Sequence, residues 1–381
     1  MQLTTRRRLL QGVVTTLAGM TCAATPPRVA LAQTGITGTR RETIVGLVRQ
    51  FMDGHTVPGL SVAFGRDGRL IYEQGFGFAD VGHRVQVTPA HQFRIASVSK
   101  PITACATLGL VEHGRLALGD PVFGARGVLG TTFGGGPYTP HVEGITIEHL
   151  LTHTSGGWSN VGNDPMAQRP EWSQADLIAW VLTSVPLAAR PGTRYDYSNF
   201  GYCVLGRVIE KVTGRPYAQY VREAILDRCG IGDIAIAGSR LSERAANEVE
   251  YFGELGDDPY GLNVRRMDAH GGWLATARDL VRFAMHVDGF AAPRDILSPA
   301  TIRTMTQPSA LNAGYAKGWN VNDQGVWWHD GNLPGTMAIL VRTSSGLCWA
   351  ALANTRRLRS AMGRELDRLM WHLSRQLTER R

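Results

Sequence analysis

The chain has 381 residues, with 40 basic side chains against 32 acidic ones and a formal net charge of +8. This length suits two compact domains or one unit with two lobes, and no internal repeat or long linker divides the chain. Because no basic run is interleaved with aromatic residues, we expect no nucleic-acid partner.

The first 32 residues have the composition of an export signal. Arg6 and Arg7 lie in a Thr-Arg-Arg-Arg-Leu-Leu sequence of the twin-arginine type, a mild apolar stretch follows at 13–24, and Ala30-Leu31-Ala32 fits a small-residue cleavage site. We predict export to the periplasm or the medium, with cleavage near Ala32 and no permanent membrane span, since the apolar stretch is too short. Removing residues 1–32, which hold four arginines and no acid, lowers the charge from +8 to +4. A disordered basic tail is the alternative.

The N-terminal part of the mature chain is predicted to begin with a helix and a hairpin. Residues 42–52 have a helical pattern. Residues 58–65 and 70–78 are predicted to be adjacent strands, joined by the Arg-Asp-Gly-Arg turn at 66–69.

The chain then becomes helix-rich before more strands follow. Residues 102–111 and 200–212 predict helices, and the Gly-rich stretch 131–139 predicts a surface loop. Three strands are predicted near the C-terminus, at 326–328, 337–342 and 347–353. A basic helix is predicted at 356–381, with its apolar side formed by Leu358, Met362, Leu366, Leu369 and Met370.

Strands at both ends of the chain with helices between them predict an α/β (α+β) fold. We expect an antiparallel sheet flanked by N- and C-terminal helices, with an inserted helical lobe. In this interpretation residues 33–381 form one unit. Its α/β lobe takes about 40–120 and 265–381, and its helical lobe takes about 121–264.

Ser97 and Lys100 form a Ser-x-x-Lys pair at the predicted start of a helix. A serine attacks a carbonyl at neutral pH only if a neighbour takes its proton. A lysine three residues later lies on the same helix face, and burial or nearby positive charge can lower its pKa enough for that task. The chain has only three lysines, and an arginine could not act as this base. The alternative is a solvated lysine in the first helical turn.

Tyr197-Ser198-Asn199 precedes the second predicted helix and follows a loop marked by Pro191-Gly192. Tyr197 could relay a proton, and the Asn199 amide could bind a substrate carbonyl. The alternative is a structural turn in which Ser198 or Asn199 caps the helix.

His329-Asp330-Gly331 lies before the turn Leu333-Pro334-Gly335 and could supply an oxyanion-binding strand. The alternative is an ordinary strand end with a structural histidine. The three motifs together, in this order and at these wide separations, indicate a serine acyl-transfer enzyme without a Ser-His-Asp triad.

Residues 33–381 contain Cys105, Cys203, Cys229 and Cys348, which we expect to be mostly buried thiols. A disulfide is permitted outside the cytoplasm, but four cysteines allow three pairings and the sequence does not choose between them. Because no His-Glu-x-x-His or Cys-x-x-Cys motif is present, we predict no metal and no cofactor.

The motifs together resemble the penicillin-recognising serine hydrolases, in the branch of class C β-lactamases, DD-carboxypeptidases, D-aminopeptidases and related esterases. The resemblance covers about residues 40–375 and implies a β-lactamase/transpeptidase-like fold. It identifies the superfamily but does not separate one activity from another. It rests on Phe93–Lys100, Leu150–Gly156, Tyr195–Asn199, Leu205–Gly206, Ile209–Lys211, His270–Gly272, Trp328–Gly331 and Ala353–Thr355.

The resemblance implies that Ser97 forms an acyl-enzyme while Lys100 and Tyr197 share its deprotonation. Which of these two is the base stays open, because coupled groups titrate as a unit. It further implies that Asn199 orients the substrate.

For the third motif, the resemblance implies that the backbone N–H groups of Ser97 and Asn332, the latter following Gly331, form the oxyanion hole. His329 would polarise Tyr197 or contact the substrate, and would add a titration near neutral pH.

The sequence departs from the β-lactamase pattern at two positions. His329 stands where β-lactamases have lysine, which is more similar to the peptidases and esterases. Asp330 replaces a threonine and, if it faces the cleft, would repel a substrate carboxylate. Residues 318–328 also contain no arginine to hold such a group. Both departures favour neutral esters, amides or amine-bearing substrates.

We therefore expect an exported, monomeric serine hydrolase of the esterase or D-amino-acid peptidase/amidase type, acting on a small-molecule or peptide substrate. One alternative is a β-lactamase or DD-carboxypeptidase. Another is a penicillin-binding sensor that is acylated but does not turn over.

Overall fold

The structure is a computed structural model that describes residues 38–378. The predicted export signal at 1–32, with its cleavage site near Ala32, lies outside the described residues. The described residues all belong to one compact unit.

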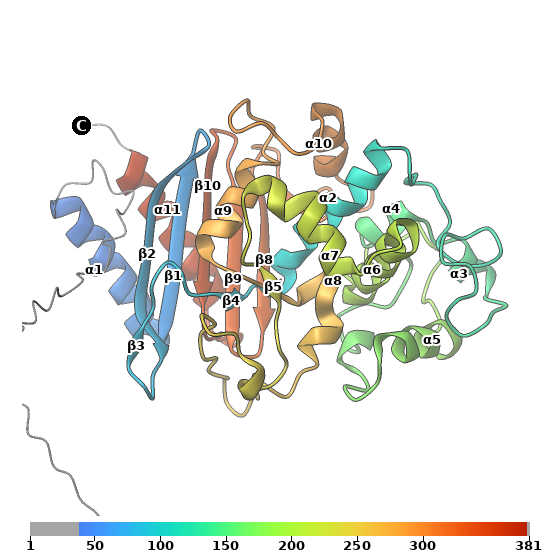
Figure 1. The fold of residues 1–381 in the computed structure, drawn as a ribbon, viewed down its shortest axis with the longest axis horizontal. Helices are drawn as coiled ribbons and strands as arrows, with labels where there is room; N and C mark the ends of the chain where they lie inside the picture. Colours follow the sequence, from blue (N-terminus) through green and yellow to red (C-terminus); the bar gives the residue numbers. More distant parts are fainter. Residues whose placement is uncertain (1–37, 379–381) are drawn as a thin grey trace, which may run out of the picture. The chain divides into compact units, whose positions relative to one another are not determined.

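A seven-stranded antiparallel sheet forms the centre of this unit (Figure 1). Its strands are β1 (Gly59–Arg66), β2 (Arg69–Asp80), β3 (Val85–Gln86), β7 (Asn320–Val321), β8 (Trp327–Leu333), β9 (Thr336–Arg342) and β10 (Leu347–Ala353). The spatial order is β3-β2-β1-β10-β9-β8-β7. The N-terminal and C-terminal strands therefore meet where β1 pairs with β10.

Helices α1 (Gly38–His55) and α11 (Met362–Thr378) pack on one face of this sheet. Strand β1 shows why this arrangement buries the strand completely. Leu60, Val62 and Phe64 join the core beneath the two helices, while Ala63 joins the larger core on the opposite face. Successive side chains of a strand point to opposite faces, so a strand covered on both sides is apolar at nearly every position.

The opposite face of the sheet carries the remaining helices and the larger core. The α-helices are α2 (Ser99–Glu112), α3 (Pro140–Glu143), α4 (Ile147–Leu151), α5 (Gln174–Ser184), α6 (Asn199–Thr213), α7 (Tyr217–Val221), α8 (Asp268–Gly271), α9 (Ala277–Met285) and α10 (Pro299–Thr306). Shorter helical turns are η1 (Ala96–Val98), η2 (Pro165–Ala167), η3 (Arg222–Leu226), η4 (Asp227–Cys229), η5 (Leu241–Glu243) and η6 (Val264–Met267).

A second, three-stranded antiparallel sheet brings distant segments of the chain together. It consists of β4 (Phe93–Arg94), β6 (Trp273–Ala275) and β5 (Ala235–Ile236), in that spatial order. The Ile95 N–H donates to the Trp273 carbonyl at 3.0 Å. This pairing places the start of α2 beside α8.

The structure confirms the predicted antiparallel sheet with flanking helices, and most predicted elements lie within one to four residues of their expected bounds. The turn between β1 and β2 has positive φ at Asp67 and Gly68, the conformation of a tight hairpin. One detail of the C-terminal helix was wrong. The helix begins at Met362, so Leu358 lies before it and is 58% exposed.

All four cysteines of the described part are free and buried. The expected buried thiols are thereby confirmed, and none of the three possible pairings is formed. No helix among residues 38–378 is both long enough and apolar enough to cross a bilayer.

Candidate active site

Ser97 and Lys100 lie at the junction of η1 and α2, where the chain enters the helix. Ala96, directly before Ser97, has a φ of 48°, a left-handed conformation that non-glycine residues rarely adopt. This turn leads into the helix so that the Lys100 Nζ lies 2.8 Å from the Ser97 Oγ. The two residues that the sequence pairs are therefore in hydrogen-bond contact.

The Lys100 amine is fully buried and has three oxygen neighbours. Besides Ser97 Oγ, it lies 2.7 Å from Asn199 Oδ1 and 3.0 Å from the His270 carbonyl oxygen. Burial lowers the pKa of Lys100 to about 7, against the opposing effect of the carboxylates of Asp164 and Asp330. A neutral amine can donate its two N–H groups to Asn199 and His270, which leaves its lone pair for the Ser97 hydroxyl proton.

Tyr197 and Asn199 flank Ser198, whose hydroxyl caps α6 by accepting from the Gly201 N–H at 3.1 Å. The Tyr197 phenol forms a hydrogen bond with Ser97. Burial raises the pKa of Tyr197 well above its ordinary value. Tyr197 is therefore a neutral phenol, suited to relaying a proton rather than to acting as a phenolate base.

A chain of hydrogen bonds runs behind Tyr197. The Ser198 N–H donates to His153 Nδ1 at 3.1 Å, which leaves the ring proton of His153 on Nε2. His153 Nε2 then donates to the Tyr315 hydroxyl at 3.1 Å, and Tyr315 donates to His329 Nε2 at 3.3 Å. His329 Nδ1 donates in turn to the Asp330 carbonyl at 2.7 Å. Each ring nitrogen therefore has one partner in the neutral form.

The expectation that His329 titrates near neutral pH was wrong. His329 is 2% exposed, and burial lowers its pKa to about 4, despite the opposing Asp330 carboxylate. Its ring centroid is 6.3 Å from that of Tyr197, and its Nε2 accepts from Tyr315 instead. His329 thus lies beside the site as a neutral, hydrogen-bonded ring.

Gly331 allows strand β8 to approach the nucleophile. A Cβ at this position would lie 2.2 Å from the Ile95 carbonyl oxygen and 3.1 Å from the Ser97 nitrogen. Since real Cβ atoms do not come within 3.0 Å of backbone atoms, only glycine fits here without a shift. The next residue, Asn332, lines the same cleft as Ser97.

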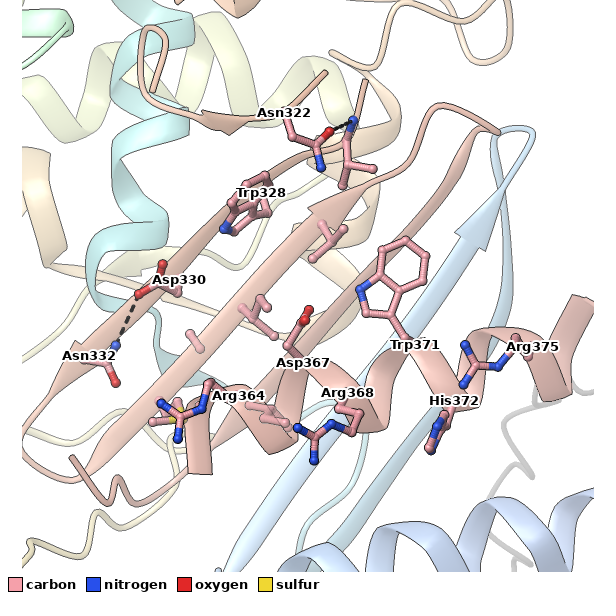
Figure 2. A pocket seen from close by; sticks show the side chains of 17 residues that line it. Asn322, Trp328, Asp330, Asn332, Arg364, Asp367, Arg368, Trp371, His372 and Arg375 are labelled. Carbon is pink, nitrogen blue, oxygen red and sulfur yellow. Dashed lines mark hydrogen bonds between the residues drawn. The ribbon is translucent and has the colours of Figure 1, made fainter. Parts of the chain in front are cut away.

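Asp330 does not line that cleft, so the condition under which it would repel a substrate carboxylate is not met. Its side chain is exposed on the other face of β8. There it lies with Trp328 and Asn332 beside α11, and the Asn332 Nδ2 donates to its Oδ2 at 3.4 Å (Figure 2). Strand alternation sends His329 and Gly331 to one face and Asp330 to the other.

The cleft at Ser97 has a volume of about 270 Å³. It contains the carboxylate of Asp164, which accepts from Asn199 Nδ2 at 2.7 Å, and the ring of His270, whose Nε2 is buried without a hydrogen-bond partner among the described residues. Burial raises the pKa of Asp164 and lowers that of His270. The cleft is lined by Ala96, Ser97, Asn160, Asp164, Met166, Ala167, Asn199, Leu262, Met267, His270, Gly271, Asn332, Leu333 and Pro334.

Sequence reasoning did not identify His153, Asp164 or Tyr315 as site residues. His153 and His270 stand in segments that carry the family resemblance, so the resemblance was a usable signal for them. Nothing in the sequence around Asp164 or Tyr315 marks them. Among residues 38–378, no group of three or more His, Cys, Asp or Glu side chains is arranged to hold a metal ion.

Comparison with known proteins agrees with this geometry. A family model described as Beta-lactamase matches residues 44–369. Penicillin-binding protein 4 of Amycolatopsis lactamdurans is 32% identical over 327 residues, which cover 79% of this chain and 81% of that protein. Protein Rv1367c of Mycobacterium tuberculosis is 31% identical over 285 residues, which cover 68% of this chain and 69% of that protein.

Solved structures of similar fold include the octameric penicillin-binding protein homologue from Pyrococcus abyssi. It aligns with a TM-score of 0.68 and 26% identity, over 87% of this chain and 77% of that chain. The D-amino acid amidase from Ochrobactrum anthropi SV3 aligns with a TM-score of 0.72 over 88% of this chain and 99% of that chain. Its identity is 22%, so this likeness shows the fold alone. The expected β-lactamase/transpeptidase-like fold is confirmed.

Proposed function

Since this chain belongs to the beta-lactamase family, we propose that it is a serine hydrolase that forms an acyl-enzyme on Ser97 and then hydrolyses it. The observation that carries this proposal is the buried Lys100 amine. It lies 2.8 Å from Ser97 Oγ, and its pKa is lowered to about 7. A general base with a pKa near the working pH combines a populated neutral form with a useful driving force for proton transfer.

In this mechanism Ser97 Oγ attacks the carbonyl carbon of an ester or amide, and its proton passes to Lys100 Nζ. The proton then moves through the neutral Tyr197 phenol to the leaving group. In deacylation a water molecule gives a proton to Lys100 Nζ while its oxygen attacks the acyl carbon. The bond from that carbon to Ser97 Oγ then breaks, and the proton returns from Lys100 to Ser97 Oγ. The raised pKa of Tyr197 and the lowered pKa of Lys100 support Lys100 as the base and Tyr197 as the relay.

The backbone N–H groups of Ser97 and Asn332 are the proposed oxyanion hole. Support comes from Gly331, whose missing side chain lets β8 lie against the Ser97 backbone. Removing one oxyanion donor typically costs about 3–4 kcal/mol of transition-state stabilisation.

The substrate class that we propose is an ester or amide with a neutral or amine-bearing acyl group. Asp330 no longer supports this choice, because its side chain lies outside the cleft. Asp164 supports an amine-bearing substrate instead, because its carboxylate lies in the cleft and could pair with an ammonium group. Among the described residues that line the cleft, none is an arginine or lysine that would hold a substrate carboxylate.

A panel of substrates tests this function. We expect continuous product release from p-nitrophenyl esters and D-amino-acid amides, and slower turnover of a chromogenic cephalosporin and of peptides ending in D-Ala-D-Ala. A burst of one equivalent without turnover on every substrate would indicate the acylated sensor instead. Faster hydrolysis of the cephalosporin or of the D-Ala-D-Ala peptide would indicate a β-lactamase or DD-carboxypeptidase.

Replacing Asp164 tests the proposed amine recognition separately. Asp164→Asn keeps the size of the side chain and removes its charge. We expect kcat/KM for a D-amino-acid amide to fall about tenfold or more relative to that for p-nitrophenyl acetate, which has no amine. Equal losses on both substrates would leave the hydrolase assignment intact but would contradict the amine-bearing class.

Export and a monomeric state are further parts of the proposal. Export is supported by the twin-arginine-like sequence alone, and the monomeric state by no observation on the described residues. Arg6→Lys/Arg7→Lys should retain the precursor in the cytoplasm if the twin-arginine interpretation is right. Normal secretion of that variant would contradict it.

A further inference from the structure

A second cavity, larger than the cleft at Ser97, lies elsewhere among the described residues. It is a groove of about 680 Å³ between α11 and the neighbouring face of β8 and β9 (Figure 2). We call it the α11 groove. Small-molecule sites in proteins typically have volumes of roughly 300–1,000 Å³. The groove is lined by Asn322, Val326, Trp328, Asp330, Asn332, Met337, Ala338, Ile339, Val341, Gly363, Arg364, Leu366, Asp367, Arg368, Trp371, His372 and Arg375.

The floor of the α11 groove is apolar and aromatic. Strand β9 supplies aliphatic surface through Met337, Ile339 and Val341, and Trp328 and Trp371 add two indole rings. Trp371 is held in place by an edge-on contact with Trp349, with ring centroids 4.6 Å apart. Figure 2 shows the Trp371 ring between the helix and the strands. A preformed floor of this kind favours an extended apolar chain.

The rim of the groove is cationic. Arg364, Arg368 and Arg375 are exposed along α11, and none of them has a hydrogen bond or ion pair with any residue in 38–378. Other arginines of the chain are paired: Arg207 lies 2.7 Å from Asp268, and Arg356 lies 2.8 Å from Asp257. The three groove arginines therefore have donors available for an anion.

Basic side chains outnumber acidic ones around the groove, which favours an anionic ligand. His372 adds a fourth nitrogen-bearing side chain, one turn beyond Arg368. The two opposing carboxyls are Asp330, which accepts from Asn332, and Asp367, which accepts from Trp371. Burial raises the pKa of Asp367 above its ordinary value. Positions 364 to 375 of a helix span about 16 Å, so the cations follow the length of the groove.

We propose that the α11 groove binds an anionic amphiphile, with one apolar chain on the floor and a carboxylate, sulfate or phosphate head at the arginines. A guanidinium fork matches such a head with two parallel hydrogen bonds. The apolar chain is taken out of water by the strand residues and the two indoles. This site is separate from Ser97 and does not depend on the proposed hydrolase function.

Quenching of tryptophan fluorescence tests the proposal directly. Two of the nine tryptophans of the chain line the groove. A bromine on the ligand quenches an indole that it contacts. We expect 11-bromoundecanoate, added as a monomer, to quench saturably and to bind at least tenfold more tightly than 11-bromoundecanol. Equal quenching by the acid and the alcohol would show that the arginines bind no head group and would overturn the proposal.

A pair of charge-matched variants separates the groove from the overall charge of the protein. Arg364→Gln/Arg368→Gln should weaken binding of 11-bromoundecanoate at least tenfold. The control, Arg126→Gln/Arg303→Gln, removes the same charge from exposed arginines outside the groove and should change binding less than twofold. Equal weakening of binding in both variants would show that binding depends on the net charge of the protein and would contradict a site in the groove.

Gly363→Leu tests the groove by filling it. A Cβ on Gly363 would lie 3.8 Å from Met337 Cε, an ordinary contact, so the new side chain has room to enter the groove. Leucine also favours a helix more than glycine does, so the melting temperature should not fall. We expect loss of binding by at least tenfold. Wild-type binding by a folded Gly363→Leu protein would place the ligand elsewhere.

Binding to anionic vesicles and sedimentation of the protein test two other occupants of the groove, a membrane surface and a second copy of this chain. Phosphatidylglycerol vesicles should bind more weakly than the free bromo acid, because the groove is recessed between a helix and a sheet. Tighter binding to vesicles, lost in Arg364→Gln/Arg368→Gln, would mean that the face docks on a membrane surface. A dimer that Gly363→Leu dissociates would mean that a second copy fills the groove. Either result would overturn the proposal.

Discussion

The two faces of strand β8 differ in how their polar groups are satisfied. On one face His329 is buried, is hydrogen-bonded at both ring nitrogens and lies next to Gly331, which touches the Ser97 backbone. On the other face Asp330 and Trp328 open onto a groove whose arginines have no partner among the described residues. Neighbouring residues of β8 thus face two different environments, the catalytic cleft and the α11 groove.

This difference shows that residues next to each other in a sequence motif can lie in different sites of the folded protein. In the catalytic cleft, burial keeps Lys100, Tyr197 and His329 near or in their neutral forms at neutral pH. In the α11 groove the charged groups remain at the surface. We expect substitutions on the cleft side to change the chemistry and substitutions on the groove side to leave it nearly unchanged.

Ser97→Ala should have the largest effect on the cleft side. We expect kcat to fall at least about 10⁴-fold, because the bond-forming oxygen is lost. Labelling by a fluorescent penicillin or a fluorophosphonate should also disappear, while the melting temperature stays near that of wild type. Labelling retained at another serine would refute the assignment of the nucleophile.

Lys100→Arg should be the next most damaging change. It keeps a cation but removes the ability to release a proton, so we expect a loss of about 10³-fold in kcat. Lys100→Met, which removes the charge but keeps an unbranched side chain, is the matched comparison and should lose a similar amount. Activity of the arginine variant within tenfold of wild type would show that Lys100 supplies only charge.

Gly331→Ala should cost about 10²-fold in kcat/KM. The added methyl group meets the Ile95 carbonyl, so β8 must move away from Ser97 and the proposed oxyanion donor moves with it. Crystallography or backbone chemical shifts of the variant would show that displacement. Unchanged kinetics with a displaced strand would mean that Asn332 contributes no oxyanion donor.

The pH profile should report Lys100 and not His329. Since the base must be neutral and its pKa is about 7, kcat/KM should fall about tenfold per unit as the pH drops below 7 and should level off above it. His329, with a pKa of about 4, stays neutral throughout that range. His329→Gln should therefore keep the midpoint within about half a unit, and a loss of the midpoint would assign it to His329.

Asp330→Asn should have the smallest effect. We expect less than a threefold change in kcat/KM, equal for substrates with and without a free carboxylate, because the side chain lies outside the cleft. Its carboxylate raises the pKa of Lys100, so the pH midpoint should move slightly downward. A selective gain for carboxylate substrates would show that Asp330 reaches the substrate.

Local patterns in the sequence predicted the helices and strands and the catalytic residues that they carry. They did not predict which face of a strand a side chain occupies or how deeply a titratable group is buried. Ser97 and Lys100 are three residues apart, so helix geometry alone brings them together. The direction of Asp330 depends on which face of β8 meets η1, and alternation fixes only that it differs from His329. The titration of His329 was misjudged because burial is a property of the packed molecule.

Residues from distant segments were the hardest to predict. Asp164 reaches the cleft from the loop before η2, and Tyr315 reaches His329 from the segment between α10 and β7. No spacing rule links these positions to Ser97. Only the assembled fold brings them together.

The four buried thiols bear on when and where this chain can fold. Burial raises the pKa of Cys203 and Cys229 to about 12, so these thiols stay protonated and react slowly with disulfides. Small secreted domains often wait for an oxidising compartment to complete their native state. Here the native state of residues 38–378 contains no bridge, so it can be reached in a reducing cytosol.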